Sequence, residues 1–215
     1  MPGQTQENRK PFLKIIGGKI AQEVEKNTQG AKLREYETVN LKTGIKTKGS
    51  KWELFYIGWT GFLRSINIKE SEYGQMCYIE VDDAILVIHA DSRYFADFVK
   101  KIFSADLNKS ITITPYDFEV DGKKRKGISL KQDNVKLPNY FYNPEKKKNL
   151  HKFPEVDEKK KDDMGKKYWD VYFAEVTAFL VNKLKTIEIP ERKTESIQII
   201  YPSDDENPKL DDLPF

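Results

Sequence analysis

The region between residues 52 and 133 is the part of the sequence that most limits how the chain can fold. Five segments of it are rich in β-branched and aromatic residues, which is typical of β-strands. They lie at 52–69, 76–82, 84–90, 109–118 and 124–132. The Asp121–Gly122 pair between the last two segments favours a tight hairpin, because both residue types accept positive φ angles. The sequence therefore predicts five consecutive strands, with one longer connection after the third.

An amphipathic helix is predicted in that longer connection, residues 91–105. Its apolar side chains fall at i, i+3, i+4, i+7 and i+8, the spacing of one face of an α-helix. They are Phe95, Phe98, Val99, Ile102 and Phe103. Asp91 or Ser92 precedes them as the N-cap residue. The predicted order is three strands, one helix and two strands.

This order is the plan of the OB-fold, a five-stranded Greek-key β-barrel with one helix between strands 3 and 4. Gly58 and Gly61 in the first predicted strand support the interpretation. Glycine weakens a flat strand, but it lets a long strand bulge and bend around a barrel corner. We therefore expect a mainly β protein in which residues 52–133 form an OB-fold core.

The segments outside this core are assigned by composition and periodicity. Residues 1–51 are expected to pack on the barrel as an N-terminal extension, and their pattern allows either a strand or a hairpin. Residues 134–201 contain a Lys-rich stretch at 138–167, expected to be a solvated, mobile loop, and then a helix. The apolar stripe of that helix is Trp169, Phe173, Val176, Leu180, Leu184 and Ile187. Residues 202–215 are acidic with little to bury, so we expect a disordered tail.

Composition excludes several classes of protein. The single cysteine, Cys77, allows no intramolecular disulfide and no Cys-based zinc site. No apolar run approaches the roughly 20 residues needed to span a bilayer, and 33% of the residues are charged. The first ten residues lack the apolar segment of a signal peptide. We therefore expect a cytoplasmic protein without membrane contact.

Strict alternation assigns the faces of three predicted strands, because successive side chains of a strand point to opposite sides. The residues expected to face the core are Cys77, Ile79, Val81, Ile111, Ile113, Ile128 and Leu130. The residues expected to face outward include Tyr78, Tyr116, Arg125 and Lys131.

Aromatic and basic side chains are interleaved around these outward positions and at the basic hairpin, residues 123–126. Unstacked bases need flat partners, while Lys and Arg displace counterions along the phosphates. A duplex offers no exposed base faces, so the mixture favours single-stranded nucleic acid. The candidate residues for binding single-stranded DNA are Trp52, Tyr56, Trp59, Arg64, Lys69, Tyr73, Tyr78, Tyr116, Lys123, Lys124, Arg125 and Lys131.

Signals for catalysis are weaker. Residues 44–51 have the glycine spacing of a P-loop but lack its Gly-Lys-Ser/Thr ending. Asp82 and Asp83 stand where two strands must turn, and Asp91 stands at a helix start, so structural roles account for all three. No catalytic residue, metal or cofactor is assigned. A metal-dependent nuclease that uses these carboxylates stays an alternative, as does an RNA-binding or strand-annealing OB-fold protein.

The formal net charge of +3 combines two parts of opposite sign. Residues 204–215 carry five carboxylates and one lysine, a net charge of −4, so the rest of the chain carries +7. The printed sequence ends Asp211-Asp212-Leu213-Pro214-Phe215. This ending resembles the C-terminal tip of the bacterial single-stranded-DNA-binding protein family.

The resemblance implies a function for both parts of the chain. In that family an OB-fold domain coats single-stranded DNA, and a flexible acidic tail recruits replication, recombination and repair enzymes. Here the docking residues would be Asp211, Asp212, Leu213, Pro214 and Phe215, because a terminal Phe offers both a ring and an α-carboxylate. We further expect the tail to compete with DNA for the basic body.

The layout of the body is more similar to phage-encoded single-stranded-DNA-binding proteins. The longer N-terminal region, the Lys-rich stretch and the large C-terminal helix differ from the bacterial family, so a monomer or dimer is favoured over its tetramer. We therefore expect a non-enzymatic protein that coats and protects single-stranded DNA, located in the host cytoplasm if it is phage-encoded.

Overall fold

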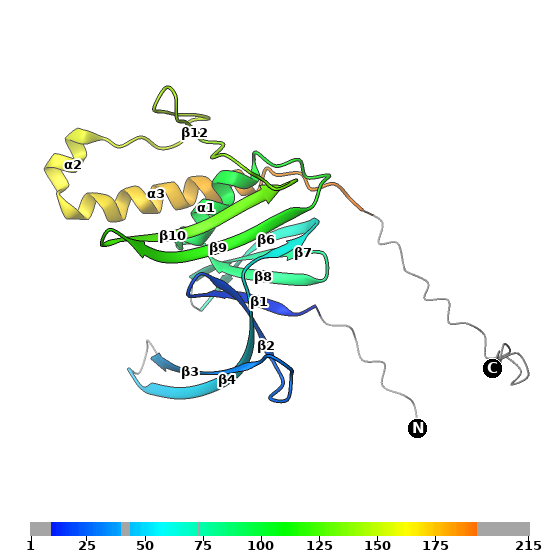
Figure 1. The fold of residues 1–215 in the computed structure, drawn as a ribbon. Coiled ribbons are helices and arrows are strands. Elements are labelled where there is room, and N and C mark those ends of the chain that lie inside the picture. The colour runs from blue at the N-terminus through cyan, green and yellow to red at the C-terminus, as the bar shows by residue number, and fades with distance from the viewer. Residues whose placement is uncertain (1–9, 40–43, 73, 193–215) are drawn as a thin grey trace, which may run out of the picture.

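The computed structural model describes residues 10–39, 44–72 and 74–192 and has a mainly β fold (Figure 1). Its strands are β1 (Phe12–Ile16), β2 (Lys19–Val24), β3 (Lys32–Val39), β4 (Lys46–Tyr56), β5 (Trp59–Gly61), β6 (Leu63–Ser71), β7 (Gly74–Val81), β8 (Ala84–His89), β9 (Ile111–Val120), β10 (Lys123–Gln132), β11 (Val135–Lys136), β12 (Tyr142–Asn143) and β13 (Lys148–Asn149). Its helices are α1 (Arg93–Ile102), α2 (Glu158–Met164) and α3 (Lys166–Leu184). In these ranges no helix combines the length and the apolar character that crossing a bilayer requires.

Most of the strands belong to two sheets. A seven-stranded sheet has the order β3-β4-β2-β1-β8-β7-β6, and a four-stranded sheet has the order β11-β10-β9-β5. The seven-stranded sheet is mixed, because β1 and β8 run parallel with Leu13 opposite Leu86, while its other neighbours are antiparallel. A short third sheet pairs β12 with β13.

The predicted order of three strands, a helix and two strands is confirmed as β6, β7, β8, α1, β9 and β10. The first predicted strand, 52–69, is instead divided into three parts: the last residues of β4, the whole of β5 and most of β6. Because β5 pairs with β9 and β6 pairs with β7, this segment joins the two sheets. Gly61 lies at the junction, where a Cβ atom would be 2.5 Å from Asp82 Oδ2 and 2.8 Å from Val81 Cγ1. The close approach of these two side chains therefore favours glycine at this junction.

The closed five-stranded barrel is not seen among the described strands. A closed barrel would need β8 to pair with β10. In the described strands β8 pairs with β7 and β1, and β10 pairs with β9 and β11. The region before residue 52 supplies three complete strands, and β4 crosses the boundary that the sequence placed between extension and core. The described residues before position 52 thus supply strands of the main sheet rather than an extension packed on a barrel.

The core lies between α1 and the inner faces of the two sheets. All seven strand residues expected to face inward are buried, as are Phe95, Phe98, Val99 and Ile102 of α1. Ser92 is the N-cap residue of α1, and its hydroxyl accepts a hydrogen bond from the amide of Phe95 at 3.2 Å. The predicted helix and its buried face are therefore confirmed, except that Phe103 follows the last helical residue and is half-buried.

The stretch at 138–167 is not the solvated loop that its lysines suggested. Phe141 is buried, and its ring lies 5.6 Å from that of Phe103, the C-cap residue of α1, and 5.5 Å from that of Phe179 on α3. The amide of Tyr140 also donates a hydrogen bond to the carbonyl of Lys100. Aromatic packing therefore fixes the first half of this stretch against α1 and α3, while its second half forms α2, which has no buried residue.

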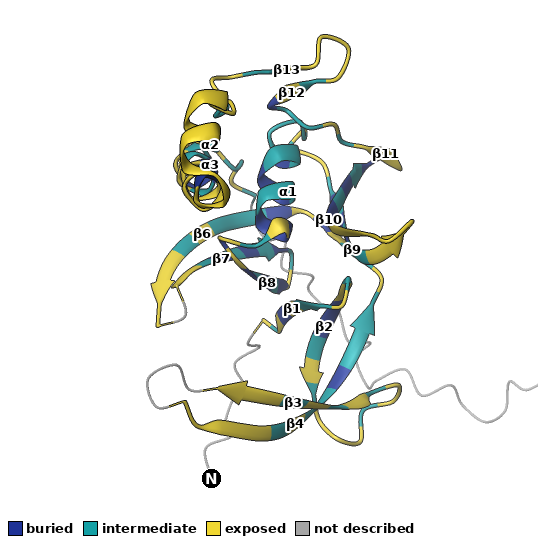
Figure 2. Ribbon diagram, turned by 90° about the vertical axis from the view of Figure 1, so that its left-hand side faces the viewer, coloured by how far each residue is buried: buried dark blue, intermediate teal, exposed yellow. Residues whose placement is uncertain are grey.

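The apolar stripe predicted for α3 is only partly buried. Val176, Leu180 and Leu184 are buried as expected, but Trp169 and Phe173 are 38% and 57% exposed. The amino-terminal half of α3 extends past α1, and Figure 2 shows exposed residues along it. The stripe therefore continues beyond the body on which its carboxyl-terminal half packs.

Candidate nucleic-acid interface

The outward side of β7 and β8 forms the first candidate surface. Since Cys77 and Ile79 point into the core, the pleat directs Met76 and Tyr78 outward. Tyr78 lies between Asn67 on β6 and Val87 on β8 in the sheet register. On the neighbouring β1, Phe12 pairs with outward Ile85 of β8 and is 56% exposed. We name this surface the β7–β8 face, defined by Phe12, Lys14, Arg34, Lys69, Met76, Tyr78, Val87 and Lys126.

Two hairpins flank this face. The β3–β4 and β9–β10 hairpins both project to the left in Figure 1, and Figure 2 views the molecule from that side. A pocket lies between them, to which β1, β3, β7, β8, α1 and β10 all contribute side chains. Among the described residues that line it are the cations Lys14, Arg34 and Lys126 but no carboxylate. The pocket is therefore suited to an anionic ligand.

Arg34 is fixed in position on the β3–β4 hairpin. It forms an ion pair with the buried Glu53, and its guanidinium lies 5.4 Å from the centroid of the Tyr36 ring. The hydrogen bond to Glu53 raises the pKa of Arg34 above its ordinary value. The Tyr36 ring covers Gly49 so closely that a Cβ there would lie 2.6 Å from it. The hairpin thus presents one ordered cation beside one half-buried aromatic ring.

Cations also lie over aromatic rings elsewhere on the β7–β8 face. The ammonium of Lys69 is 5.5 Å from the centroid of Tyr78, and that of Lys126 is 4.8 Å from the centroid of Tyr94. Lys126 additionally lies 4.0 Å from a carboxylate oxygen of Asp117. Within the described ranges, Lys14 and Lys69 form no ion pair. Their charges are available to phosphates.

The candidate residues from the sequence are distributed over several places. Lys69 and Tyr78 lie together on the β7–β8 face. Tyr56 and Trp59 contact each other at 5.3 Å and pack against the core, and the Tyr56 hydroxyl donates to Gln22. Trp52 is half-buried on β4, opposite Leu33 of β3 and Val24 of β2. Tyr73 lies outside the described residues, as do the five tail residues 211–215.

The remaining strand candidates lie on the four-stranded sheet. Tyr116 and Arg125 line a second pocket, while Lys123 and Lys131 project from the same side of β10. The Tyr116 hydroxyl donates a hydrogen bond to Asp97 at 3.0 Å, and burial together with the Asp97 charge raises the pKa of Tyr116 to about 12. Lys124 points to the opposite side of the hairpin, because it alternates with Lys123 and Arg125.

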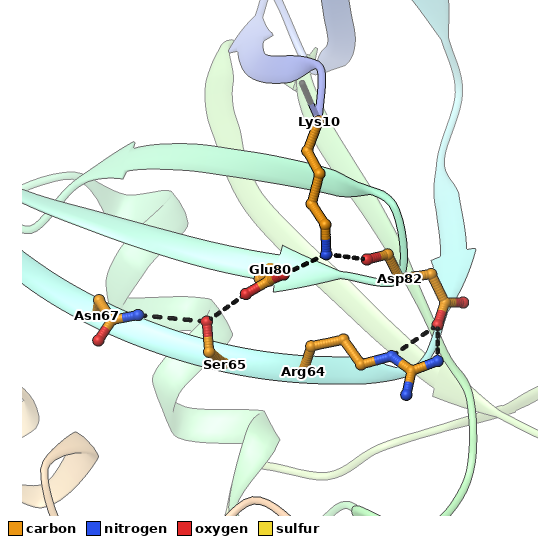
Figure 3. Close-up of polar contacts among 6 residues, drawn as sticks. All are labelled: Lys10, Arg64, Ser65, Asn67, Glu80 and Asp82. Carbon is orange, nitrogen blue, oxygen red and sulfur yellow. Dashed lines mark hydrogen bonds and ion pairs between the residues drawn. The ribbon is translucent and has the colours of Figure 1, made fainter. Parts of the chain in front are cut away.

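Arg64 belongs to a polar network at β6 and β7, and not to the β7–β8 face or to the second pocket (Figure 3). Its guanidinium donates to Asp82 Oδ1 at 2.9 Å, and Asp82 Oδ2 accepts from the amide of Phe62 at 3.0 Å. Lys10 contacts Glu80, and the Ser65 hydroxyl donates to Glu80 at 2.7 Å. These two contacts lower the pKa of Glu80. The charge of Arg64 is thus matched within the protein.

Of the carboxylates considered for nuclease chemistry, Asp82 has structural contacts, whereas Asp83 and Asp91 are exposed. The helix cap is Ser92 rather than Asp91. Asp82 takes a positive φ of 47° in the β7–β8 turn and binds Arg64, as described above. Within the described ranges no three His, Cys, Asp or Glu side chains come together as a metal site would require. Burial raises the pKa of the Cys77 thiol to about 12, so this thiol is not an activated nucleophile.

The candidate residues from the sequence do not include three cations of the β7–β8 face, namely Lys14, Arg34 and Lys126, although Lys126 belongs to the basic hairpin at 123–126. Lys14 and Arg34 come from the region whose secondary structure the pattern left open. The alternation Leu13, Lys14, Ile15 in a short strand was the available signal for an outward Lys14. The contribution of Arg34 depends on the folding of the β3–β4 hairpin toward β8, which no local pattern encodes.

Comparison with family models, with curated proteins and with solved structures gives no match to this chain.

Proposed function

We propose that the protein binds single-stranded DNA on the β7–β8 face and protects it during replication, recombination and repair. The observation that carries this proposal is the pocket lined by Lys14, Arg34 and Lys126, next to Tyr78 and the exposed Phe12. Among the described residues Lys14 has no ion pair, whereas Arg34 and Lys126 are paired with Glu53 and Asp117, which do not line the pocket. Cations match the phosphates, and exposed rings match unpaired bases.

We also propose that β5 to β10 with α1 are an opened form of the OB-fold plan. In that plan β5 and β6 together are strand 1, β7 and β8 are strands 2 and 3, and β9 and β10 are strands 4 and 5. Strand β1 then pairs in parallel with β8, at the edge of strand 3 where strand 5 would pair in a closed barrel. OB-folds bind oligonucleotides on the face of strands 2 and 3 and with the loops beside it, which supports the choice of the β7–β8 face.

Recruitment of partner proteins is proposed for the acidic segment. Residues 211–215 resemble the recruiting tip of the bacterial single-stranded-DNA-binding family, which supports a role in docking replication and recombination proteins. The −4 charge of residues 204–215 favours basic partner surfaces.

A salt-series titration of fluorescent oligo-dT against a matched duplex tests the proposed binding. We expect a strong preference for the single strand and an affinity that falls steeply with salt. For single strands, each phosphate contact contributes about 0.7 to the slope of log affinity against log salt concentration. Lys14→Ala and Lys69→Ala should each lower the slope by about that amount, and Tyr78→Ala should lower affinity by about 1 to 3 kcal/mol with less change in slope.

Lys185→Ala is the matched control, because this exposed lysine at the end of α3 lines neither of the two pockets described above. Equal affinity for duplex and single strand would contradict the proposal, as would a Lys185→Ala effect equal to that of Lys14→Ala.

Two further measurements separate the alternatives. Competition of oligo-U against oligo-dT identifies an RNA-binding protein if oligo-U wins. Incubation of labelled single strands with Mg²⁺ or Mn²⁺ identifies a nuclease if cleavage occurs and is lost in Asp83→Ala, whose side chain is exposed.

A further inference from the structure

The outward side of β9 and β10 is a separate surface that the β7–β8 face does not include. In the register of this hairpin, Tyr116 lies opposite Gly127 and Phe118 lies opposite Arg125. Their side chains point away from the core, because Ile128 and Leu130 point inward. We name this surface the β9–β10 face, defined by Tyr116, Phe118, Val120, Lys123, Arg125, Ser129, Lys131 and Lys136.

The β9–β10 face carries unmatched positive charge. Among the described residues that line its pocket are the cations Lys101, Arg125 and Lys136 but no carboxylate. Lys101 is paired with Asp97, at 3.0 Å. In contrast, Arg125, Lys136, Lys123 and Lys131 form no ion pair within the described ranges. Four free cations on one sheet face attract a polyanion.

An aromatic platform lies among these cations. The ring of Phe118 is 51% exposed and lies 5.6 Å from the ring of Tyr116. The hydrogen bond from Tyr116 to Asp97 fixes the Tyr116 ring, so the Phe118 ring packs against an ordered neighbour. A large exposed ring beside free cations is the combination that binds unstacked bases and their phosphates. An acidic peptide would use the cations but would not need a flat exposed ring.

The two faces lie on opposite sides of one hairpin. Lys126 lines the pocket of the β7–β8 face, whereas Arg125 lines that of the β9–β10 face. Neighbouring residues of a strand point to opposite sides, so the hairpin separates the two pockets. A strand bound in one pocket therefore leaves the cations of the other free.

We infer that the β9–β10 face is a second site for single-stranded nucleic acid, so that one molecule holds two strand segments at once. This inference rests on the proposed function and extends it, because a protein that holds two strands brings them together and promotes their annealing. Phe118 stacks on a base, and Arg125, Lys123, Lys131 and Lys136 contact the phosphates beside it.

Stoichiometry and bridging test the second site in the full chain. Calorimetric titration with an oligo-dT of about eight nucleotides, within the site size of one OB-fold, should give two oligonucleotides per chain. The double variant Phe118→Ala/Arg125→Ala should give one, because both side chains are exposed and the fold does not depend on them. The control Phe173→Ala/Lys185→Ala removes an exposed ring and an exposed cation from α3 and should keep two.

Energy transfer between a donor-labelled and an acceptor-labelled oligonucleotide measures bridging. The wild-type chain and the α3 control should bridge the two oligonucleotides. In the β9–β10 variant the energy-transfer signal should fall about tenfold, while the variant still binds one oligonucleotide. Bridging that survives in the β9–β10 variant would overturn the second site, as would one oligonucleotide per wild-type chain. A chain that binds no single strand at all would instead remove the proposed function itself.

Discussion

The guanidinium of Arg34 donates two hydrogen bonds, of 2.5 and 2.8 Å, to the carboxylate of Glu53, although the latter is only 3% exposed. A buried carboxylate is tolerated when such a bidentate partner compensates its lost hydration. The pair joins adjacent strands β3 and β4 and fixes Arg34, which lines the pocket of the β7–β8 face.

Arg34→Ala should lower the free energy of unfolding by about 2 to 3 kcal/mol, because it leaves the Glu53 carboxylate buried and unpaired. Urea denaturation measures the change. Arg34→Lys keeps the charge but not the bidentate geometry, so its loss should be intermediate. The double variant Arg34→Ala/Glu53→Gln should recover part of the stability, and a double variant as unstable as the sum of both single changes would contradict this account.

Stability should decrease in acid through Glu80. The pKa of Glu80 is lowered in the folded protein by the contacts with Lys10 and Ser65. A lowered carboxyl pKa contributes stability above the unfolded value, about 4.3, and this contribution disappears as the pH falls through the lower folded value. Glu80→Gln should therefore flatten the acid limb of the stability–pH curve from thermal unfolding. An unchanged acid limb would show that the network does not operate in solution.

Stability should also decrease in alkali through Tyr116. Because the pKa of this phenol is raised to about 12, the folded state favours the protonated form. The contribution is complete below the ordinary pKa, about 10, and is lost as the pH rises toward the folded value. Tyr116→Phe should cost about 1 kcal/mol at neutral pH and remove this alkaline dependence. Phenolate absorbance titration of both proteins identifies the high-pKa tyrosine.

Gly61→Ala should destabilise the protein by about 1 to 3 kcal/mol, because the added Cβ would overlap Asp82 and Val81 at the junction of the two sheets. The control Thr60→Ala changes the preceding exposed residue and should cost less. Differential scanning calorimetry compares the two, and equal melting temperatures would contradict the tight junction.

Deletion of residues 204–215 should tighten binding of single-stranded DNA at low salt, because it removes a charge of −4 that competes for the basic faces. The difference should vanish at high salt, where charges are screened. Unchanged affinity at low salt would refute the competition. Phe215→Ala keeps the charge, so it should weaken partner recruitment without changing DNA affinity.

The local elements of the central region could be predicted from the sequence. Ser92 and the helical spacing from Phe95 to Phe103 identify α1, and Asp121–Gly122 identifies the β9–β10 hairpin, whose two turn residues have φ angles of 52° and 68°. These signals act over a few residues. The faces of β7, β9 and β10 followed for the same reason, because alternation is a local property.

Long-range packing could not be predicted in this way. Phe141 lies between Tyr140 and Tyr142 in a stretch whose lysines suggested a solvated loop, yet it is buried against the rings of Phe103, at the end of α1, and Phe179 on α3. Tyr56 and Trp59 have the composition of a binding surface, but their mutual contact belongs to the core. Arg34 and Lys126 reach one pocket from strands more than eighty residues apart, so only the assembled sheets bring them together.

The parallel pairing of β1 with β8 has a consequence for the use of shortened chains. Phe12 and Leu13 pair with Ile85 and Leu86, so β1 covers the backbone edge of a strand rich in aliphatic residues. A chain that lacked its first 18 residues would expose that edge, and uncovered aliphatic edges pair with other molecules and aggregate. Shortening at the amino end should therefore reduce solubility before it affects any ligand.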